Sequence, residues 1–434
     1  VFESQGNEWR FAHDKLREAI RRRLPQAKRQ RLHREVAEAL ESLYDQAARE
    51  PMAAMLAYHC SEAGLHDRAL IYYIIAGDSA ARLCLYDQAR AHYAAGQGEL
   101  RHLPDTAPYR RAKVDLLLKQ VQTALLTDPA QTQMDRLAEA RALLEAQDAE
   151  TGDASANDPL RMARVNYYSG RVLHYSGQPA AAIKYFQRVL PVAQELGDEE
   201  LLVMPASVIG VALCMQGHNS RGRDLLKQAI GPLQRLGNKF EYLRAVLFHG
   251  LTSASCGNFT AGLADMEQAY AEAVQINQPS VLAMCQLMFS AIFRVAGDWP
   301  QCIRAAKRSI EHAKQSGDKV YLFSSWSYLG WAQSYLGEHE AALASRSEAL
   351  AIKQAFGGRL IITDWFDAAD GEVALNAQRD WDALQKAQTV ATTSRSMGLV
   401  LSTGLAERVW GAALRRLSDD PTESDQHFTA SIAA

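Results

Sequence analysis

The stretch HYSGQPAAAIKYFQRVLPVAQELGDEE (174–200) returns in altered form four more times, first as CMQGHNSRGRDLLKQAIGPLQRLGNKF (214–240). Two series of residues mark the repeat, and the spacing within each is 40 residues: Gly177, Gly217, Gly257, Gly297 and Gly337, and then Gly197, Gly237, Asn277, Gly317 and Gly357. Glycine and asparagine tolerate the left-handed backbone conformation that ends helices. Two helix ends in every 40 residues therefore predict two helices per repeat.

Small residues also recur inside the predicted helices. The first helix carries Gly170, Gly210, Gly250, Ser290 and Gly330, and the second carries Ala182, Gly222, Gly262, Cys302 and Ala342. Because glycine costs about 1 kcal/mol relative to alanine in a helix interior, its recurrence at one phase predicts close helix contact. A single helix pair cannot bury its apolar faces, whereas stacked pairs can. We therefore predict an all-α fold, a right-handed α-solenoid with a period of about 40 residues.

The stretch SWSYLGWAQSYLGEHEAALASRSEAL (325–350) resembles a tetratricopeptide repeat (TPR) in its Leu-Gly pair, its Gly-Glu turn and its alanine pairs. Repeats of that family usually have a period of about 34 residues, so longer helices would account for the longer period here. A sixth repeat is expected with its register slipped by two residues. In it, Arg379-Asp380-Trp381 would take the place of Gly297-Asp298-Trp299.

The first residues of the chain differ from the repeats. VFESQGNEWRFA (1–12) predicts a β-hairpin around a Gln-Gly-Asn turn, and a helix is expected from about His13 to Leu24. The order of FAHDKLREA, LHREVAEALE and LAYHCSEAG within residues 11–64 resembles a junction in large bacterial signalling ATPases of the STAND class. These include LuxR-type regulators and multidomain kinases or cyclases. In that family the hairpin and helix belong to a winged-helix domain, and the helical superhelix after it is a sensor or scaffold arm.

The resemblance implies four segments in this chain. They are the end of a winged-helix domain with a linker helix (1–45), irregular TPR-like helix pairs (46–156), regular TPR-like repeats (157–400) and truncated C-terminal helices (401–434). It also implies an ATPase domain before residue 1, which this arm would contact, and an output domain after residue 434.

Two functions fit this organisation. The first is a protein- or ligand-binding sensor or scaffold domain of a larger cytosolic bacterial signal-transduction ATPase, regulating the ATPase and the output domain. The alternative is a stand-alone TPR adaptor or chaperone-like interaction protein. The hairpin and FAHDKLREA favour the first, since a free adaptor has no use for part of a winged helix.

No catalytic role is expected for the chain itself. The sequence contains no GxxxxGK[ST] motif, and therefore no P-loop, and no HExxH, GxSxG or CxxC motif. We expect no catalytic residue, no cofactor and no metal site. A helical-toroid enzyme, the third possibility, would need acidic or histidine clusters facing a cavity, and the sequence shows none.

Composition limits the partners. The chain has 434 residues and a net charge of −3, which gives no general attraction to nucleic acid or to anionic membranes. The longest uncharged run, 278–293, is shorter than the roughly 18 residues that span a bilayer, so we expect a cytoplasmic protein without membrane contact. The six cysteines lack metal-site spacing and are expected to be reduced, buried and apolar in role.

A basic run lies close to the predicted winged helix. A solvated helix face or a contact with the ATPase domain is expected there, and nucleic acid is not an expected partner, with DNA contact as the alternative. The run consists of Arg21, Arg22, Arg23, Lys28, Arg29, Arg31 and Arg34.

We expect the binding site on the concave face, which is lined by the first helix of each repeat. Only that face presents side chains from successive repeats to one continuous surface. Arginine supplies charge and a planar set of donors, and aromatic side chains supply large contact area. A protein or small-molecule effector would bind there, with packing between repeats as the alternative role of the same residues. The candidates are Arg164, Tyr167, Arg171, His174, Arg244, Arg294, Trp331 and Tyr335.

Overall fold

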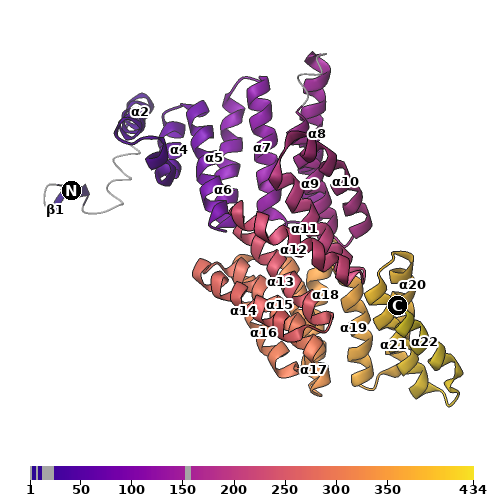
Figure 1. Cartoon of the computed structure of the whole chain (residues 1–434). Coiled ribbons are helices and arrows are strands. Elements are labelled where there is room, and N and C mark those ends of the chain that lie inside the picture. Colours follow the sequence, from indigo (N-terminus) through magenta and orange to yellow (C-terminus); the bar gives the residue numbers. More distant parts are fainter. Residues whose placement is uncertain (1, 6–7, 12–23, 152–157) are drawn as a thin grey trace. The chain divides into compact units, whose positions relative to one another are not determined.

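The chain is described by a computed structural model that covers residues 2–5, 8–11, 24–151 and 158–434. Helices make up nearly all of it, in a tandem arrangement, which confirms the predicted α-solenoid (Figure 1). The chain divides into two compact parts, residues 1–123 and residues 124–434. The four segments expected from the sequence stay a prediction.

The N-terminal part begins with an antiparallel pair of strands, β1 (Phe2–Gln5) and β2 (Glu8–Phe11), in which Phe2 pairs with Phe11. The helix expected between residues 13 and 24 falls outside the described residues. Helix α2 packs on α4, and α4 on α5, around buried side chains such as Leu56 and Cys60. The helical elements are α2 (Gln26–Leu43), α3 (Gln46–Arg49), a 3₁₀ turn (Glu50–Met52), α4 (Ala53–Glu62), α5 (His66–Arg82), α6 (Tyr86–Glu99), a 3₁₀ turn (Leu100–His102) and α7 (Ala107–Ala124).

The C-terminal part contains the regular repeats. After α8 (Ala130–Thr151), successive helix pairs follow one another, and in each pair the first helix packs on the second. The pairs are α9 (Pro159–Tyr175) with α10 (Pro179–Leu196), α11 (Glu199–Met215) with α12 (Asn219–Arg235), α13 (Lys239–Ser255) with α14 (Phe259–Ile276), α15 (Pro279–Ala296) with α16 (Trp299–Ser316), α17 (Lys319–Tyr335) with α18 (His339–Ala355), α19 (Thr363–Asn376) with α20 (Asp380–Ser396), and α21 (Val400–Leu417) with α22 (Pro421–Ala433).

The first helices form a layer of their own. Each of them, from α9 to α19, contacts the first helix of the next pair, so that the odd-numbered helices lie side by side as far as α21. The second helices pack on the first helix of their own pair and on that of the next pair. A surface that runs through successive repeats is therefore built from odd-numbered helices.

The turns and helix contacts follow the predicted phases. Every glycine of the two turn series has a positive φ, and Asn277 takes the same conformation with φ of 49°. Inside the third repeat, a Cβ atom added to Gly250 would lie 2.6 Å from the carbonyl oxygen of Gly262. The small residues thus allow the backbones of α13 and α14 to approach closely.

The predicted register of the sixth repeat is wrong by one residue. Its left-handed turn residue is Gln378, with φ of 58°, and α20 begins at Asp380. The corresponding residues of the fourth repeat are Gly297 and Trp299, so the slip is one residue and not two. The fourth and sixth repeats share an Asp-Trp pair, which suggested the wrong register. The turn residue of the sixth repeat, Gln378, is not a glycine and gave no signal in the sequence.

The sequence predicts that the six cysteines are buried. Five of the six cysteines are buried, as expected, but Cys256 is exposed because it lies in the turn after α13.

Among the described residues, one helix, α15, is long and apolar enough to cross a membrane, with a mean hydropathy of 1.5. It is mostly buried between neighbouring helices, which is the usual position of a core helix.

The segment between α18 and α19 returns to the first repeat. Ile361 N–H donates to the carbonyl oxygen of Tyr175 at 2.7 Å, and Arg359 Nε donates to that of Gly177 at 3.0 Å. Gly177 has φ of 71°, and a Cβ atom there would lie 2.7 Å from the carbonyl oxygen of Leu360. Only glycine fits both demands. We call this the closing contact, and its bond from Arg359 to Gly177 joins residues 182 positions apart in the chain.

Candidate functional site

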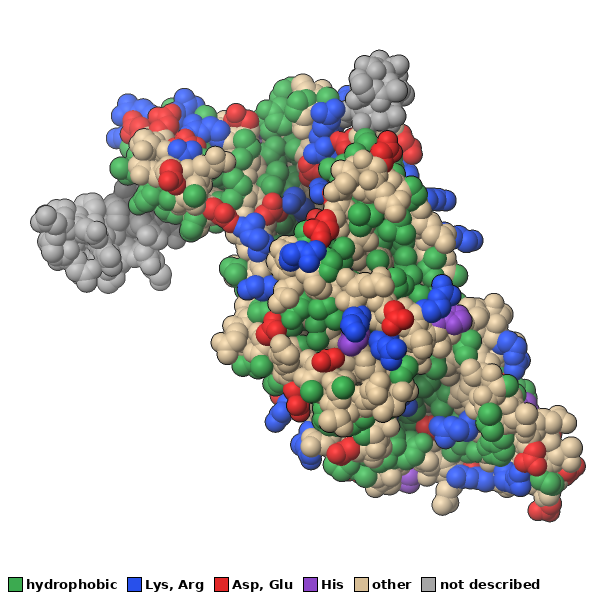
Figure 2. Space-filling view, in the orientation of Figure 1, with side chains coloured by type: hydrophobic (Ala, Val, Ile, Leu, Met, Phe, Trp, Pro, Cys, Tyr) green, Lys and Arg blue, Asp and Glu red, His purple; other side chains and the backbone are tan. Residues whose placement is uncertain are grey.

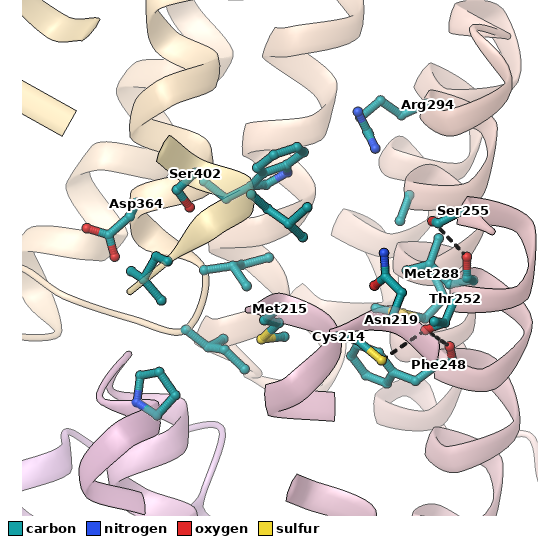
Figure 3. Close-up of a pocket in the computed structure, with 18 of the residues that line it drawn as sticks. Cys214, Met215, Asn219, Phe248, Thr252, Ser255, Met288, Arg294, Asp364 and Ser402 are labelled. Carbon is teal, nitrogen blue, oxygen red and sulfur yellow. Dashed lines mark hydrogen bonds between the residues drawn. The ribbon is translucent and has the colours of Figure 1, made fainter. Parts of the chain in front are cut away.

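A cavity of about 410 Å³ lies between the odd-numbered helices, next to the closing contact (Figure 3). We call it the central cavity. Side chains from α9, α11, α13, α15 and α17 form much of its wall, and the starts of α19 and α21 complete it. The lining residues are His174, Gly177, Pro179, Cys214, Met215, Asn219, Phe248, Leu251, Thr252, Ser255, Leu287, Met288, Ala291, Arg294, Val295, Tyr328, Ile361, Ile362, Asp364, Trp365, Leu399, Leu401 and Ser402.

Most of the wall is apolar, and several of its polar groups are already bonded. Thr252 Oγ1 donates to the carbonyl oxygen of Phe248 at 2.7 Å and contacts Cys214 Sγ at 3.3 Å. Ser255 Oγ donates to the carbonyl oxygen of Leu251 at 3.0 Å. Both hydroxyls donate to carbonyl oxygens of their own helix, α13, so the cavity has few free hydrogen-bonding groups for a ligand.

Arg294 is the cation of the central cavity. In Figure 3 it reaches from α15, on the same side as Ser255 and Thr252, while Asp364 and Ser402 lie opposite. Its guanidinium carbon lies 5.1 Å from the ring centroid of Trp331 and 5.1 Å from that of Trp365. Such cation–π contacts hold a guanidinium without neutralising it.

The guanidinium of Arg294 has no carboxylate partner within the described part of the chain. Its Nε atom is buried and has no hydrogen-bond acceptor there. A buried donor without an acceptor costs free energy, which an incoming acceptor would recover. The group is therefore suited to bind an anion.

Three charged side chains form a second, fully buried cluster. Arg171 on α9 and Arg244 on α13 both bind Glu241, which lies in the first turn of α13. The distances are 2.7 Å from Arg171 Nη1 to Glu241 Oε1 and 2.6 Å from Arg244 Nη2 to Glu241 Oε2. Arg171 is 2% exposed, Arg244 3% and Glu241 5%. This Arg171–Glu241–Arg244 cluster links the first repeat directly to the third.

Neutral groups complete this cluster. Arg171 also donates to the hydroxyl oxygens of Tyr167 at 2.6 Å and Tyr175 at 3.2 Å, and Arg244 Nη2 to Ser207 Oγ at 3.2 Å. Burial alone would raise the pKa of Glu241, but the two guanidiniums outweigh it and lower that pKa to about 2. Two cations and one anion leave the cluster with a net positive charge.

His174 connects the cluster to the central cavity. It lines the cavity, and burial together with the charges of Arg244 and Arg171 lowers its pKa to about 3. The imidazole is therefore neutral near pH 7 and can offer a hydrogen bond but no charge.

The pKa of His174 predicts that acid weakens the fold. The unfolded imidazole takes up a proton near pH 6.5, whereas the folded one does so only near pH 3. Between these values the unfolded state binds more protons, so the free energy of unfolding falls as pH falls, by up to about 1.4 kcal/mol per pH unit.

Urea titrations at about pH 7 and about pH 5 measure this effect, with His174→Gln as the control. The wild-type protein should lose stability over that interval, and the variant should lose clearly less. An equal loss in both proteins would show that His174 is not the titrating group.

Trp331 and Tyr335 meet at one carboxylate. Trp331 Nε1 donates to Glu372 Oε2 at 2.7 Å, and Tyr335 O–H donates to the same oxygen at 3.0 Å. Arg408 pairs with the other oxygen of Glu372. Because Trp331 stacks on Arg294, Glu372 on α19 indirectly positions the guanidinium of the cavity.

The eight candidate residues thus fall into separate groups. His174 and Arg294 line the central cavity, while Tyr167, Arg171 and Arg244 belong to the buried cluster. Trp331 and Tyr335 bind Glu372, and Arg164 is half-buried on α9. Their role in binding a partner stays a prediction.

The sequence-based prediction did not name several residues of the site. Glu241 and Glu372 look like ordinary helix carboxylates in the sequence, and only their burial reveals their role. Phe248 and Thr252 follow Arg244 on α13 at spacings of four and eight residues, so the face that carries this candidate arginine also carries them. Trp365 lies where the repeat changes register.

The basic run near the N-terminus is partly described. Residues 21–23 lie outside the described part, and the remainder belongs to α2. There Arg29 lies 3.4 Å from Glu62, and Arg31 lies 3.1 Å from Glu35. On the face drawn in Figure 2, acidic and basic side chains are interspersed. That face offers no continuous basic surface of the kind that binds nucleic acid.

The fold belongs to a known class of helical solenoids, and comparison with known proteins shows this at low sequence identity. No family model matches the chain, and no curated protein matches it. A Rap protein complexed with competence and sporulation factor has a TM-score of 0.64 at 10% identity, over 84% of this chain and 96% of that one.

Two further solved structures share the fold. The Rap conjugation gene regulator of plasmid pLS20, in complex with the Phr* peptide, has a TM-score of 0.56 at 12% identity, over 82% of this chain and 94% of that one. NprR in complex with its cognate peptide NprX has a TM-score of 0.54 at 14% identity, over 82% and 99%. The likeness extends along nearly the whole of these solenoids.

Proposed function

We propose that the chain is the sensor or scaffold arm of a larger cytosolic bacterial signal-transduction ATPase. An effector binds in the central cavity, and the arm transmits its presence to an ATPase domain and an output domain. The observation that carries this proposal is the central cavity itself, which is lined by helices of successive repeats and holds a guanidinium without a carboxylate partner in the described residues.

The solved structures support a binding role. Each of the three was determined with a bound factor or peptide: competence and sporulation factor, the Phr* peptide and NprX. A solenoid of this kind can therefore bind a factor or a peptide. The resemblance of FAHDKLREA and the segments after it to STAND proteins supports the larger ATPase context.

A second candidate is a stand-alone regulator without an ATPase domain. The observation in its favour is that the match extends over 94% to 99% of the three solved chains. In this case the chain would act on a partner protein and not on a domain of its own.

The sequence preceding residue 1 in the complete protein distinguishes the two candidates. We expect a GxxxxGK[ST] motif there, ATP hydrolysis by the complete protein and none by residues 1–434 alone. The hydrolysis rate should change in the variant Arg294→Gln and stay constant in Arg308→Gln, which alters an exposed arginine of α16.

The absence of such a motif would favour the stand-alone regulator. Equal rates in both variants would contradict control of the ATPase from the central cavity. Hydrolysis by residues 1–434 that a point substitution in this chain abolishes would contradict a non-catalytic arm.

A further inference from the structure

The polar groups of the central cavity are too few for a buried peptide backbone. Each peptide unit brings a donor and an acceptor that must both be paired when water is excluded. Thr252 and Ser255 are already bonded within α13, which leaves mainly Asn219, Ser402, Arg294 and the neutral imidazole of His174. The wall between them consists of apolar side chains such as Leu251, Leu287, Met288, Ala291 and Val295.

The other charges near the cavity are compensated. Asp364 accepts from Arg359, the residue of the closing contact, and in Figure 3 its carboxylate lies across the cavity from Arg294. Arg171 and Arg244 share Glu241, and His174 is neutral near pH 7. Arg294 is therefore the one charge in the described wall that a ligand could neutralise.

We propose that the central cavity binds a small amphiphilic carboxylate, whose carboxylate pairs with Arg294 and whose apolar body packs against α13 and α15. This rests on the proposed function in taking the cavity as the effector site, and it names the chemical class of the effector. The volume of about 410 Å³ suits a small molecule, since such pockets measure roughly 300–1,000 Å³.

The surroundings of Arg294 suit a carboxylate in particular. A guanidinium presents a planar fork of donors that matches the two oxygens of a carboxylate. The rings of Trp331 and Trp365 hold that fork in place, and Glu372 fixes the ring of Trp331 through its Nε1. Less side-chain entropy is lost on binding when the donor is already held in position.

Decanoate and its neutral counterpart decanamide test the proposal on residues 1–434. Isothermal titration calorimetry should show one decanoate per chain, with decanamide about tenfold or more weaker, since it cannot form the charge-assisted bonds. In Arg294→Gln the two ligands should bind within about twofold of each other, because the charge is gone. Arg308→Gln, the exposed control on α16, should behave like the wild-type protein.

A second variant tests the position of the apolar body. Ser255 is exposed at the edge of the cavity, so Ser255→Trp should fill the cavity without disturbing the core. It should weaken both ligands by about tenfold. Thermal unfolding of each variant establishes that it is folded before binding is measured.

Three results would overturn the proposal: equal binding of decanoate and decanamide to the wild-type protein, unchanged decanoate binding in Arg294→Gln, or no saturable binding. Tighter binding of the peptide trileucine than of decanoate would also overturn it, in favour of a peptide effector. These titrations need no ATPase. Decanoate binding with no nucleotide motif in the complete protein would support this inference and contradict the proposed function. A nucleotide motif without decanoate binding would support the ATPase context and contradict this inference.

Discussion

Replacing Glu241 by alanine is expected to lower the free energy of unfolding by about 3–5 kcal/mol, the usual cost of removing one partner of a buried ion pair. The carboxylate is 5% exposed and holds the guanidiniums of Arg171 and Arg244. Without it, two like charges would stay buried close together with only hydroxyl groups as partners. Urea unfolding of residues 1–434, followed by circular dichroism, measures the change.

Glu199→Ala provides the matched control. Glu199 also forms an ion pair in the first turn of an odd-numbered helix, with Arg235 at 2.7 Å, but both side chains are exposed. Exposed pairs contribute about 0–1 kcal/mol, so this variant should unfold almost as the wild-type protein does. Similar losses for Glu241→Ala and Glu199→Ala would contradict the role assigned to the buried cluster.

The cluster also affects acid stability, in a pH range that begins and ends lower than that of His174. The pKa of Glu241 is about 2 in the folded chain and near 4.5 without its partners. A lowered carboxylate pKa stabilises the fold above the unfolded value, and this contribution is lost as pH falls from about 4.5 to about 2. The effect of His174 begins at higher pH, so the two residues can be told apart.

Gly250→Leu is expected to lower the free energy of unfolding by about 3 kcal/mol, at the upper end of the range for overpacking. Even the first atom of the new side chain would lie 2.6 Å from the carbonyl oxygen of Gly262 and 2.7 Å from Met266 Cγ. The backbones of α13 and α14 would have to separate, which disrupts the packing of the third repeat. Thermal unfolding measures the loss, and Gly250→Ala should show a smaller loss of the same sign.

Gly231→Ala tests whether the effect comes from the helix contact. Gly231 lies within α12, and apart from its chain neighbours and its own helix backbone, a Cβ atom there would come no closer than 3.8 Å to another group, Arg235 Nη1. Alanine favours a helix over glycine by about 1 kcal/mol, but Pro232 follows and disfavours a helical residue that has a Cβ atom, so the stability should change little. Destabilisation by both alanine variants, or by neither, would contradict the assignment of Gly250 to a helix contact.

The repeat architecture could be predicted because it depends on local chemistry. A position that adopts positive φ favours glycine or asparagine, and a close helix contact favours small residues, so both leave a periodic signal. The exceptions are informative. Gln378 adopts positive φ without being glycine, and the predicted register failed at that turn.

The composition of the site depends on contacts between distant residues, which a single sequence does not contain. The position of the candidates on the first helices predicted that Arg171, Arg244 and Arg294 share the concave face. It could not show that Glu241 pairs with Arg171 and Arg244, while Arg294 has no carboxylate partner among the residues that the structure describes. Likewise, Trp365 reaches the cavity only because the closing contact brings the start of α19 toward the first repeat.

The closing contact has a consequence for how the C-terminal part unfolds. In an open solenoid each repeat touches only its neighbours, so the ends can fray while the middle stays folded. Here the hydrogen bonds from Arg359 and Ile361 to the turn at Tyr175 and Gly177 oppose such fraying, because α9 cannot detach without breaking them. The helices from α9 to α19 should therefore melt in a single transition, as a globular domain does, and amide exchange should be uniformly slow across them.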